Sequence, residues 1–215
     1  MCTVIVRTGW PLTLMGVRDE YTDRPWEGPG EHWPDFPGVI GGRDLKAGGT
    51  WLAVNPSARR AAALLNGRGT AAAETTRISR GDLALRAAYT GNAPGGDLAR
   101  YDPFHLVLAG EAGARLFSWD GERLSASDLP EGVSMVVNTG LDPASERVVA
   151  YLPRFRTESW SDLVRAEPSG EPGALIVRHA LPDGRTFASL SALRVTLAPD
   201  GVTYDFADLT ADRDR

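Results

Sequence analysis

The chain has 215 residues, of which 42% are hydrophobic and 24% charged, so a single domain with its own core is expected over residues 1–215. The net charge of −5 argues against nucleic acid or an anionic membrane surface as the main partner. Neither an apolar run of about 18 residues nor a signal-peptide pattern is present, so we expect a cytoplasmic protein with no membrane span.

The first two predicted elements form a β-hairpin. Residues 3–8 are rich in β-branched side chains, and residues 11–17 form a second apolar run. The Gly-Trp pair between the two runs is typical of a two-residue type II′ turn. This turn predicts a register in which Cys2 lies opposite Val17, with the two residues after Val17 beside the cysteine.

Further strands are expected towards both ends of the chain, with helices between them. Residues 25–42 are dense in proline and glycine, which predicts a long ordered loop. Helices are expected at 79–91, 144–152 and 159–166, and strands at 48–55, 60–69, 104–110, 114–119, 122–126, 133–138, 174–179, 193–198 and 202–206. In the first helix, Ser79 and Asp82 have the spacing of a capping box and Gly91 is the stop signal. This mixture favours an α+β fold in which helices cover sheets.

The position of the only cysteine points to one kind of chemistry. Cys2 becomes the N-terminal residue when Met1 is removed, and methionine aminopeptidases act before small residues. The α-amine, whose ordinary pKa is about 7.7–8.0, then accepts the proton of its own thiol. A nearby arginine stabilises the thiolate, and Arg18 is the candidate, with Asp19 expected to hold Arg18 or the ammonium. The alternative is that Cys2 is a small apolar core residue.

Two asparagines complete the candidate acyl-transfer site. Such a site needs hydrogen-bond donors for an oxyanion. Asn66 ends the run AALLN and Asn138 ends the run SMVVN. Both are therefore expected at the edge of a sheet, where an active site would lie.

Several blocks of the sequence resemble the NRDE family, also called the transport and Golgi organisation protein 2 family. The blocks are MCTVIV, GVRDEYTDRPW, GGTWLAV, ALLNGRG, SRGDL and YDPFHLVLAG. The family's Asn-Arg-Asp-Glu signature stands here as Val17-Arg18-Asp19-Glu20, with valine in place of the asparagine. Alanine propensity alone would make 60–69 a helix, but in that family this block and GGTWLAV are neighbouring strands, so a strand is predicted.

The family is in turn similar to N-terminal nucleophile hydrolases of the choloylglycine hydrolase and penicillin V acylase type. This resemblance implies a four-layer αββα sandwich and cleavage of an amide or thioester bond of a small-molecule substrate, with no cofactor. It implies that Cys2 is the nucleophile and Arg18 its supporting cation, and that Asp19 is an approximate counterpart of the family's aspartate. It also implies that Asn66 and Asn138 bind the oxyanion and the free amine. A late arginine is also implied, and both Arg185 and Arg194 qualify.

A second function stays open. Members of the family are also described in terms of haem mobilisation and lipid or acyl-CoA metabolism, which implies a non-catalytic protein that binds or carries haem or an acyl-lipid. The aromatic segment 25–42 is then expected to cover an apolar ligand. Axial ligands of suitable type are Cys2, His32, His105 and His179. No spacing typical of a metal site is present.

Overall fold

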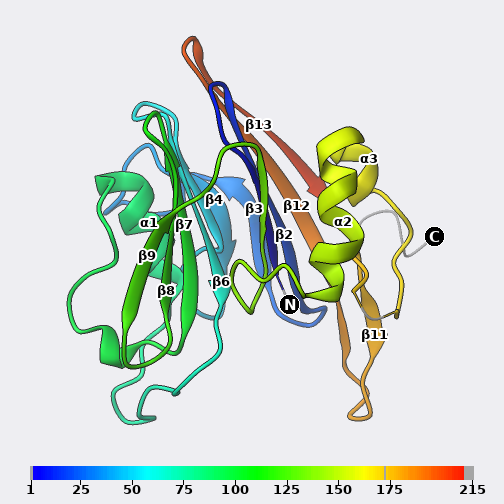
Figure 1. The fold of residues 1–215 in the computed structure, drawn as a ribbon. Helices are drawn as coiled ribbons and strands as arrows, with labels where there is room; N and C mark the ends of the chain where they lie inside the picture. The colour runs from blue at the N-terminus through cyan, green and yellow to red at the C-terminus, as the bar shows by residue number, and fades with distance from the viewer. Residues whose placement is uncertain (1, 172, 211–215) are drawn as a thin grey trace.

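The computed structural model describes residues 2–171 and 173–210, and it contains two antiparallel sheets with helices beside them (Figure 1). Sheet 1 has the strand order β10-β1-β2-β12-β11, and β13 also pairs with β12. Its strands are β1 (Thr3–Arg7), β2 (Leu12–Tyr21), β10 (Val133–Val136), β11 (Arg178–Ala180), β12 (Thr186–Ala198) and β13 (Gly201–Asp208).

Sheet 2 is a meander in which consecutive strands pair in chain order. Its strands are β3 (Trp26–Gly30), β4 (Ile40–Asp44), β5 (Leu52–Asn55), β6 (Arg60–Asn66), β7 (Phe104–Gly110), β8 (Gly113–Trp119) and β9 (Leu124–Asp128). The loop predicted at 25–42 is confirmed over residues 31–39, but the prediction is wrong at both ends, since β3 precedes that loop and β4 begins after it. Proline and glycine are tolerated in β3 because it is an edge strand, and its pairing with β4 contains a register irregularity.

The three predicted helices are confirmed as α1 (Gly81–Thr90), α2 (Glu146–Thr157) and α3 (Trp160–Val164), and a short 3₁₀ turn, η1, spans Leu98–Arg100. Leu83 and Ala87 of α1 pack against sheet 2 in one apolar cluster. Val148 of α2 and Trp160 of α3 pack against sheet 1 in another. The predicted α+β composition, with helices covering sheets, is therefore confirmed.

A third apolar cluster lies between the two sheets. Val6 and Leu14 enter it from sheet 1, and Leu52 and Leu65 enter it from sheet 2. The alanine-rich block is strand β6, as predicted from the family resemblance, because its alternate residues are buried both in this cluster and beneath α1. Burial on two faces overrides the helix propensity of alanine.

The predicted hairpin exists, but its register is wrong by one residue. Thr3, not Cys2, pairs with Val17, and the last pair before the turn is Arg7 with Thr13. The predicted two-residue turn would need an N–H group from Pro11, and proline has none to donate. The connection between β1 and β2 is therefore longer.

Two other local predictions are also wrong. Ser79 and Asp82 form no capping box, because the hydroxyl of Ser79 accepts from the N–H of Gly81 while Asp82 pairs with Arg86. The strand predicted at 174–179 is displaced to β11, because most of that segment packs as irregular chain into the cluster beneath α2 and α3. The last two predicted strands are parts of the longer β12 and β13.

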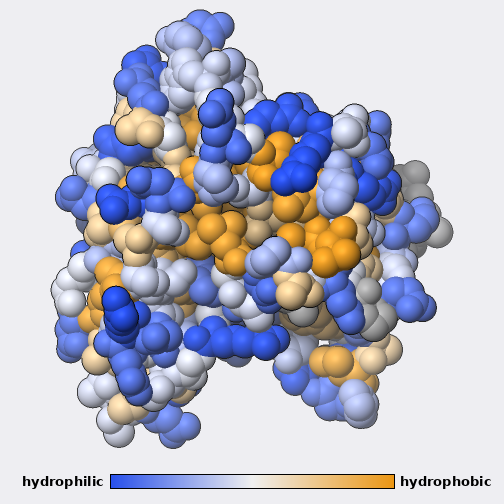
Figure 2. All heavy atoms as spheres, viewed as in Figure 1, coloured by the Kyte–Doolittle hydropathy of each residue, from blue (hydrophilic) through white to orange (hydrophobic). Residues whose placement is uncertain are grey.

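The surface on the face shown in Figure 2 is largely hydrophilic at its margins, with apolar residues gathered towards the middle. None of the helices within residues 2–171 and 173–210 is long and apolar enough to cross a membrane.

Candidate active site

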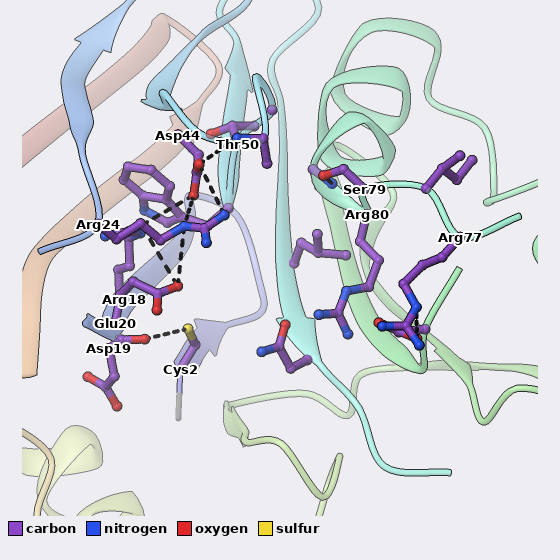
Figure 3. A pocket seen from close by; sticks show the side chains of 18 residues that line it. Cys2, Arg18, Asp19, Glu20, Arg24, Asp44, Thr50, Arg77, Ser79 and Arg80 are labelled. Atoms are coloured by element: carbon purple, nitrogen blue, oxygen red, sulfur yellow. Dashed lines mark hydrogen bonds and ion pairs between the residues drawn. The ribbon is translucent and has the colours of Figure 1, made fainter. Parts of the chain in front are cut away.

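A pocket of about 500 Å³ opens where one end of sheet 1 meets sheet 2 (Figure 3). Cys2 and the end of β2 form one side, and the segment leading into α1 forms the other. The connection from β4 to β5 and the end of β6 complete the wall. Four of the five predicted site residues line this pocket: Cys2, Arg18, Asp19 and Asn66.

The strand registers explain why Cys2 lies beside its predicted partners. Thr3 pairs with Val17 on β2, so the next position of that ladder sets Cys2 opposite Arg18. Val4 pairs with Val136 on β10, so two further positions set Cys2 opposite Asn138. Side chains alternate along a strand, and Val4 faces the cluster between the sheets. Cys2 faces the same way and packs against that cluster.

The Cys2 thiol is half-buried and lies 3.8 Å from the main-chain oxygen of Asp19, which accepts its weak hydrogen bond. Burial raises the pKa of Cys2, and the carboxylate charge of Asp19 raises it further, whereas the charge of Arg18 lowers it. The pKa lies above its ordinary value, so the thiol stays protonated at neutral pH unless a base removes the proton.

Arg18 is held by neighbours from both sheets. Its side chain is only 4% exposed, and Nη2 lies 3.5 Å from Oδ2 of Asp44 and 4.0 Å from Oε2 of Glu20. The guanidinium stacks on Trp51, 4.4 Å from the ring centroid. Burial lowers the pKa of Arg18, and the charges of Glu20, Cys2 and Asp44 counteract that shift. Its buried Nη1 has no hydrogen-bond partner among the described residues, so one donor of this guanidinium is left unsatisfied beside the pocket that Arg18 lines.

Asp44 organises the arginines on this side. It accepts two hydrogen bonds from Arg24, at 2.6 and 3.1 Å, and others from the backbone of Lys46 and Ala47. Burial acts to raise the pKa of Asp44, but the hydrogen bonds from Arg24 and the backbone outweigh it and hold the pKa below its ordinary value. No motif in the sequence indicated Asp44, since it reaches Arg18 only through the fold, and Arg24 stood in the block GVRDEYTDRPW without an assigned role.

Asp19 was expected to hold Arg18 or the free ammonium, and its carboxylate contacts Ser189 and Arg147 among the described residues. Its side chain is fully buried and accepts a hydrogen bond of 2.6 Å from Ser189 and one of 3.0 Å from Arg147. Arg147 comes from α2 and also donates to the hydroxyl of Thr3, at 2.7 Å. These bonds tie α2, β2, β12 and the first residues of β1 together behind the pocket.

The late arginine expected near the site is neither of the two candidates. Arg185 pairs with Asp183 and Arg194 pairs with Asp205, and neither arginine lines the pocket. Arg147 is the arginine from the second half of the chain that contacts Asp19.

The two asparagines are brought together from different sheets. Nδ2 of Asn138 donates to the main-chain oxygen of Asn66 at 2.7 Å. Oδ1 of Asn138 is buried and has no hydrogen-bond partner within the part of the chain that the structure describes. Asn66 lines the pocket that contains Cys2, whereas Asn138 lines a neighbouring cavity of about 320 Å³.

The three histidines lie away from the pocket. His32 contacts the main-chain oxygen of Gly28 at 2.8 Å, and Nδ1 of His105 contacts the hydroxyl of Ser118 at 2.7 Å. His179 belongs to β11. Over residues 2–171 and 173–210, no group of three or more His, Cys, Asp or Glu side chains is placed to hold a metal ion.

The fold and the protein family follow from comparison with known proteins. The structure is similar to the C2A mutant of a conjugated bile acid hydrolase from Clostridium perfringens, with a TM-score of 0.52 and 10% identity over 96% of this chain and 92% of that chain. This likeness shows that the two proteins share the same overall fold. The family described as Transport and Golgi organisation 2 matches residues 1–156, so the chain belongs to that family, as its sequence blocks predicted. No curated protein matches the sequence.

Proposed function

We propose that this protein is an N-terminal nucleophile hydrolase that cleaves an amide or thioester bond with Cys2 after removal of Met1. The observation that carries the proposal is the buried Arg18 guanidinium, which lines the same pocket as Cys2 and has an unpartnered donor. A similar fold occurs in a hydrolase whose studied mutant is C2A, and this likeness supports the same role for Cys2.

The raised pKa of Cys2 makes the activation step essential. Once Met1 is removed, the free α-amine lies on the same residue as the thiol and accepts its proton. Arg18 then stabilises the thiolate by charge. Oδ1 of Asn138 is an acceptor at the level of Cys2 in the β1–β10 register, which suits the ammonium better than an oxyanion. Asp19 supports the site from behind β2, through its hydrogen bonds with Ser189 and Arg147.

The chemical step is attack of the thiolate on the substrate carbonyl. A C–S bond forms and the carbonyl π electrons move to the oxygen, which the amide of Asn66 and Nη1 of Arg18 stabilise. The C–N bond, or the C–S bond of a thioester substrate, then breaks as the ammonium of Cys2 protonates the leaving group. Water attacks the acyl-enzyme, releases the acid and returns the proton to the thiol.

We also propose that the chain forms a single four-layer αββα domain. The three apolar clusters support it, because one lies between the sheets, one beneath α1 and one beneath α2 and α3. Each layer is therefore covered by its neighbour, as a layered domain requires.

The proposal is tested by incubating the purified full chain with a panel of short-chain p-nitroanilides and thioesters. Intact-mass spectrometry during turnover is expected to show an acyl adduct on the wild-type chain. Cys2→Ala is expected to abolish both the adduct and hydrolysis, while Arg86→Gln, a change on the exposed face of α1, keeps both. Unchanged hydrolysis by Cys2→Ala would contradict the proposal.

A further inference from the structure

The charges around the pocket are balanced on one side only. On the side of Cys2, two arginines face two carboxylates, namely Arg18 and Arg24 with Glu20 and Asp44. Asp19 also lines the pocket, and its buried carboxylate is paired with Arg147. On the opposite side, Arg77 and Arg80 share the pocket wall with one carboxylate, Asp102. That side therefore carries one more positive charge than negative charge.

Arg80 carries the excess charge. Oδ1 of Asp102 lies 3.3 Å from Nε of Arg77, and Nη2 of Arg77 donates to the main-chain oxygen of Ala72. Arg80 donates to the main-chain oxygen of Pro103 at 2.7 Å, and it forms no ion pair with a carboxylate of the described residues. Arg80 is half-buried, and a partly desolvated guanidinium is costly unless an anion compensates it.

Burial lowers the pKa of Arg80, while the charges of Asp102 and of the Cys2 thiolate counteract that shift. Arg80 and Cys2 line the same pocket from opposite sides. In Figure 3 its side chain extends from the segment before α1 into the space that faces Cys2.

The wall that carries Arg80 is fixed by close backbone packing. A Cβ atom on Gly49 would lie 2.5 Å from the Cα of Gly81, so the start of α1 rests directly on the chain before β5. The N–H of Thr50 also donates to the oxygen of Gly81 at 3.0 Å. Arg80 is thus presented by a rigid backbone, which favours a binding role over a mobile surface charge.

We infer that Arg80 binds a carboxylate of the substrate, so that the protein prefers an anionic amide or thioester to a neutral one. This inference rests on the proposed function, and it names the substrate class of the same site. The planar guanidinium matches a carboxylate through two parallel hydrogen bonds. The carboxylate belongs either to the acyl part or to the leaving group, and a pocket of about 500 Å³ has room for a small ligand of either kind.

Calorimetry on the full-length Cys2→Ala protein tests the inference without requiring catalysis. The probes are N-hexanoylglycine, with the carboxylate on the amine side, N-butylsuccinamic acid, with the carboxylate on the acyl side, and the neutral N-hexanoylglycinamide. At least one acid is expected to bind about tenfold or more tightly than the neutral amide. The acid that binds identifies the side of the scissile bond that carries the charge.

Second-site variants in the Cys2→Ala background show whether Arg80 causes the preference. Arg80→Gln is expected to remove it, Arg80→Lys to restore part of it, and Arg86→Gln to leave it unchanged. Thermal melts confirm that the variants are folded. Equal binding of all three probes, or a preference that survives in folded Arg80→Gln, would overturn the inference. Tight acid binding without hydrolysis by the wild-type chain would instead contradict only the proposed function.

Discussion

The buried ion pair behind the pocket gives a prediction about stability. Asp19→Asn removes a charge whose side chain is 0% exposed and leaves Arg147, 4% exposed, without its carboxylate. Ser189 and Thr3, which hydrogen-bond to this pair, do not replace the lost charge. Both side chains are excluded from water, so solvent does not screen the lost interaction.

The expected cost is large for a single substitution. Breaking a buried ion pair by removing one partner costs about 3–5 kcal/mol. With a slope of about 2–3 kcal/mol per molar urea, the unfolding midpoint falls by about 1–2.5 M. Equilibrium urea unfolding, followed by tryptophan fluorescence and far-UV circular dichroism, measures this shift.

Two controls make the experiment decisive. Arg147→Met removes the other charge, and the double variant with Asp19→Asn is expected to lose less stability than the sum of the two single variants. Glu158→Gln breaks the exposed pair with Arg154 and is expected to leave the midpoint unchanged. A midpoint change after Asp19→Asn as small as that after Glu158→Gln, or additive effects in the double variant, would refute the assignment of Asp19 to this ion pair.

Three other experiments test separate parts of the structure. Gly49→Ala places a methyl group against the backbone of Gly81 and is expected to cost about 1–3 kcal/mol, measured by urea unfolding; an unchanged midpoint would exclude the close packing. Because the pKa of Asp44 is lowered, its ionised carboxylate stabilises the folded state at pH values above the ordinary carboxyl pKa. This stabilisation is lost as the pH falls through the lowered pKa. Asp44→Asn is therefore expected to flatten the acid limb of the stability curve, and an unaltered limb would contradict that. Haem titration is expected to give no Soret shift, because no histidine lines the pocket and the raised pKa keeps the thiol of Cys2, the remaining candidate ligand, protonated; a shift abolished by substituting Cys2 or one histidine would favour the haem-carrier alternative.

Local patterns in the sequence were sufficient to predict the strands at the candidate nucleophile. The β-branched run before the Gly-Trp pair and the apolar run after it predicted β1 and β2, and these strands set Cys2 next to Arg18. The register was missed by one residue because the turn rule ignored the missing N–H of Pro11. Asn66 and Asn138 were found because each ends an apolar run, and the structure joins them by a hydrogen bond.

Contacts between distant segments were beyond prediction from a single sequence. Arg147 meets Asp19 only because α2 packs on the outer face of sheet 1, 128 residues further along the chain. Arg80 enters the pocket only because two glycines allow α1 to rest on the chain before β5. Arginines are frequent in this sequence, so no single one stood out, and the late-arginine candidates were wrong for that reason.

The reactivity of the only cysteine tests the central claim most directly. Intact mass is measured before and after brief treatment with limiting iodoacetamide over a range of pH, for the natural chain and for a chain with an N-terminal extension. The proposal predicts a natural chain that lacks Met1 and is alkylated rapidly at neutral pH. In the extended chain, the raised pKa of Cys2 delays alkylation until the pH exceeds the ordinary thiol range. A natural chain that retains Met1, or two chains with the same pH profile, would contradict the proposal.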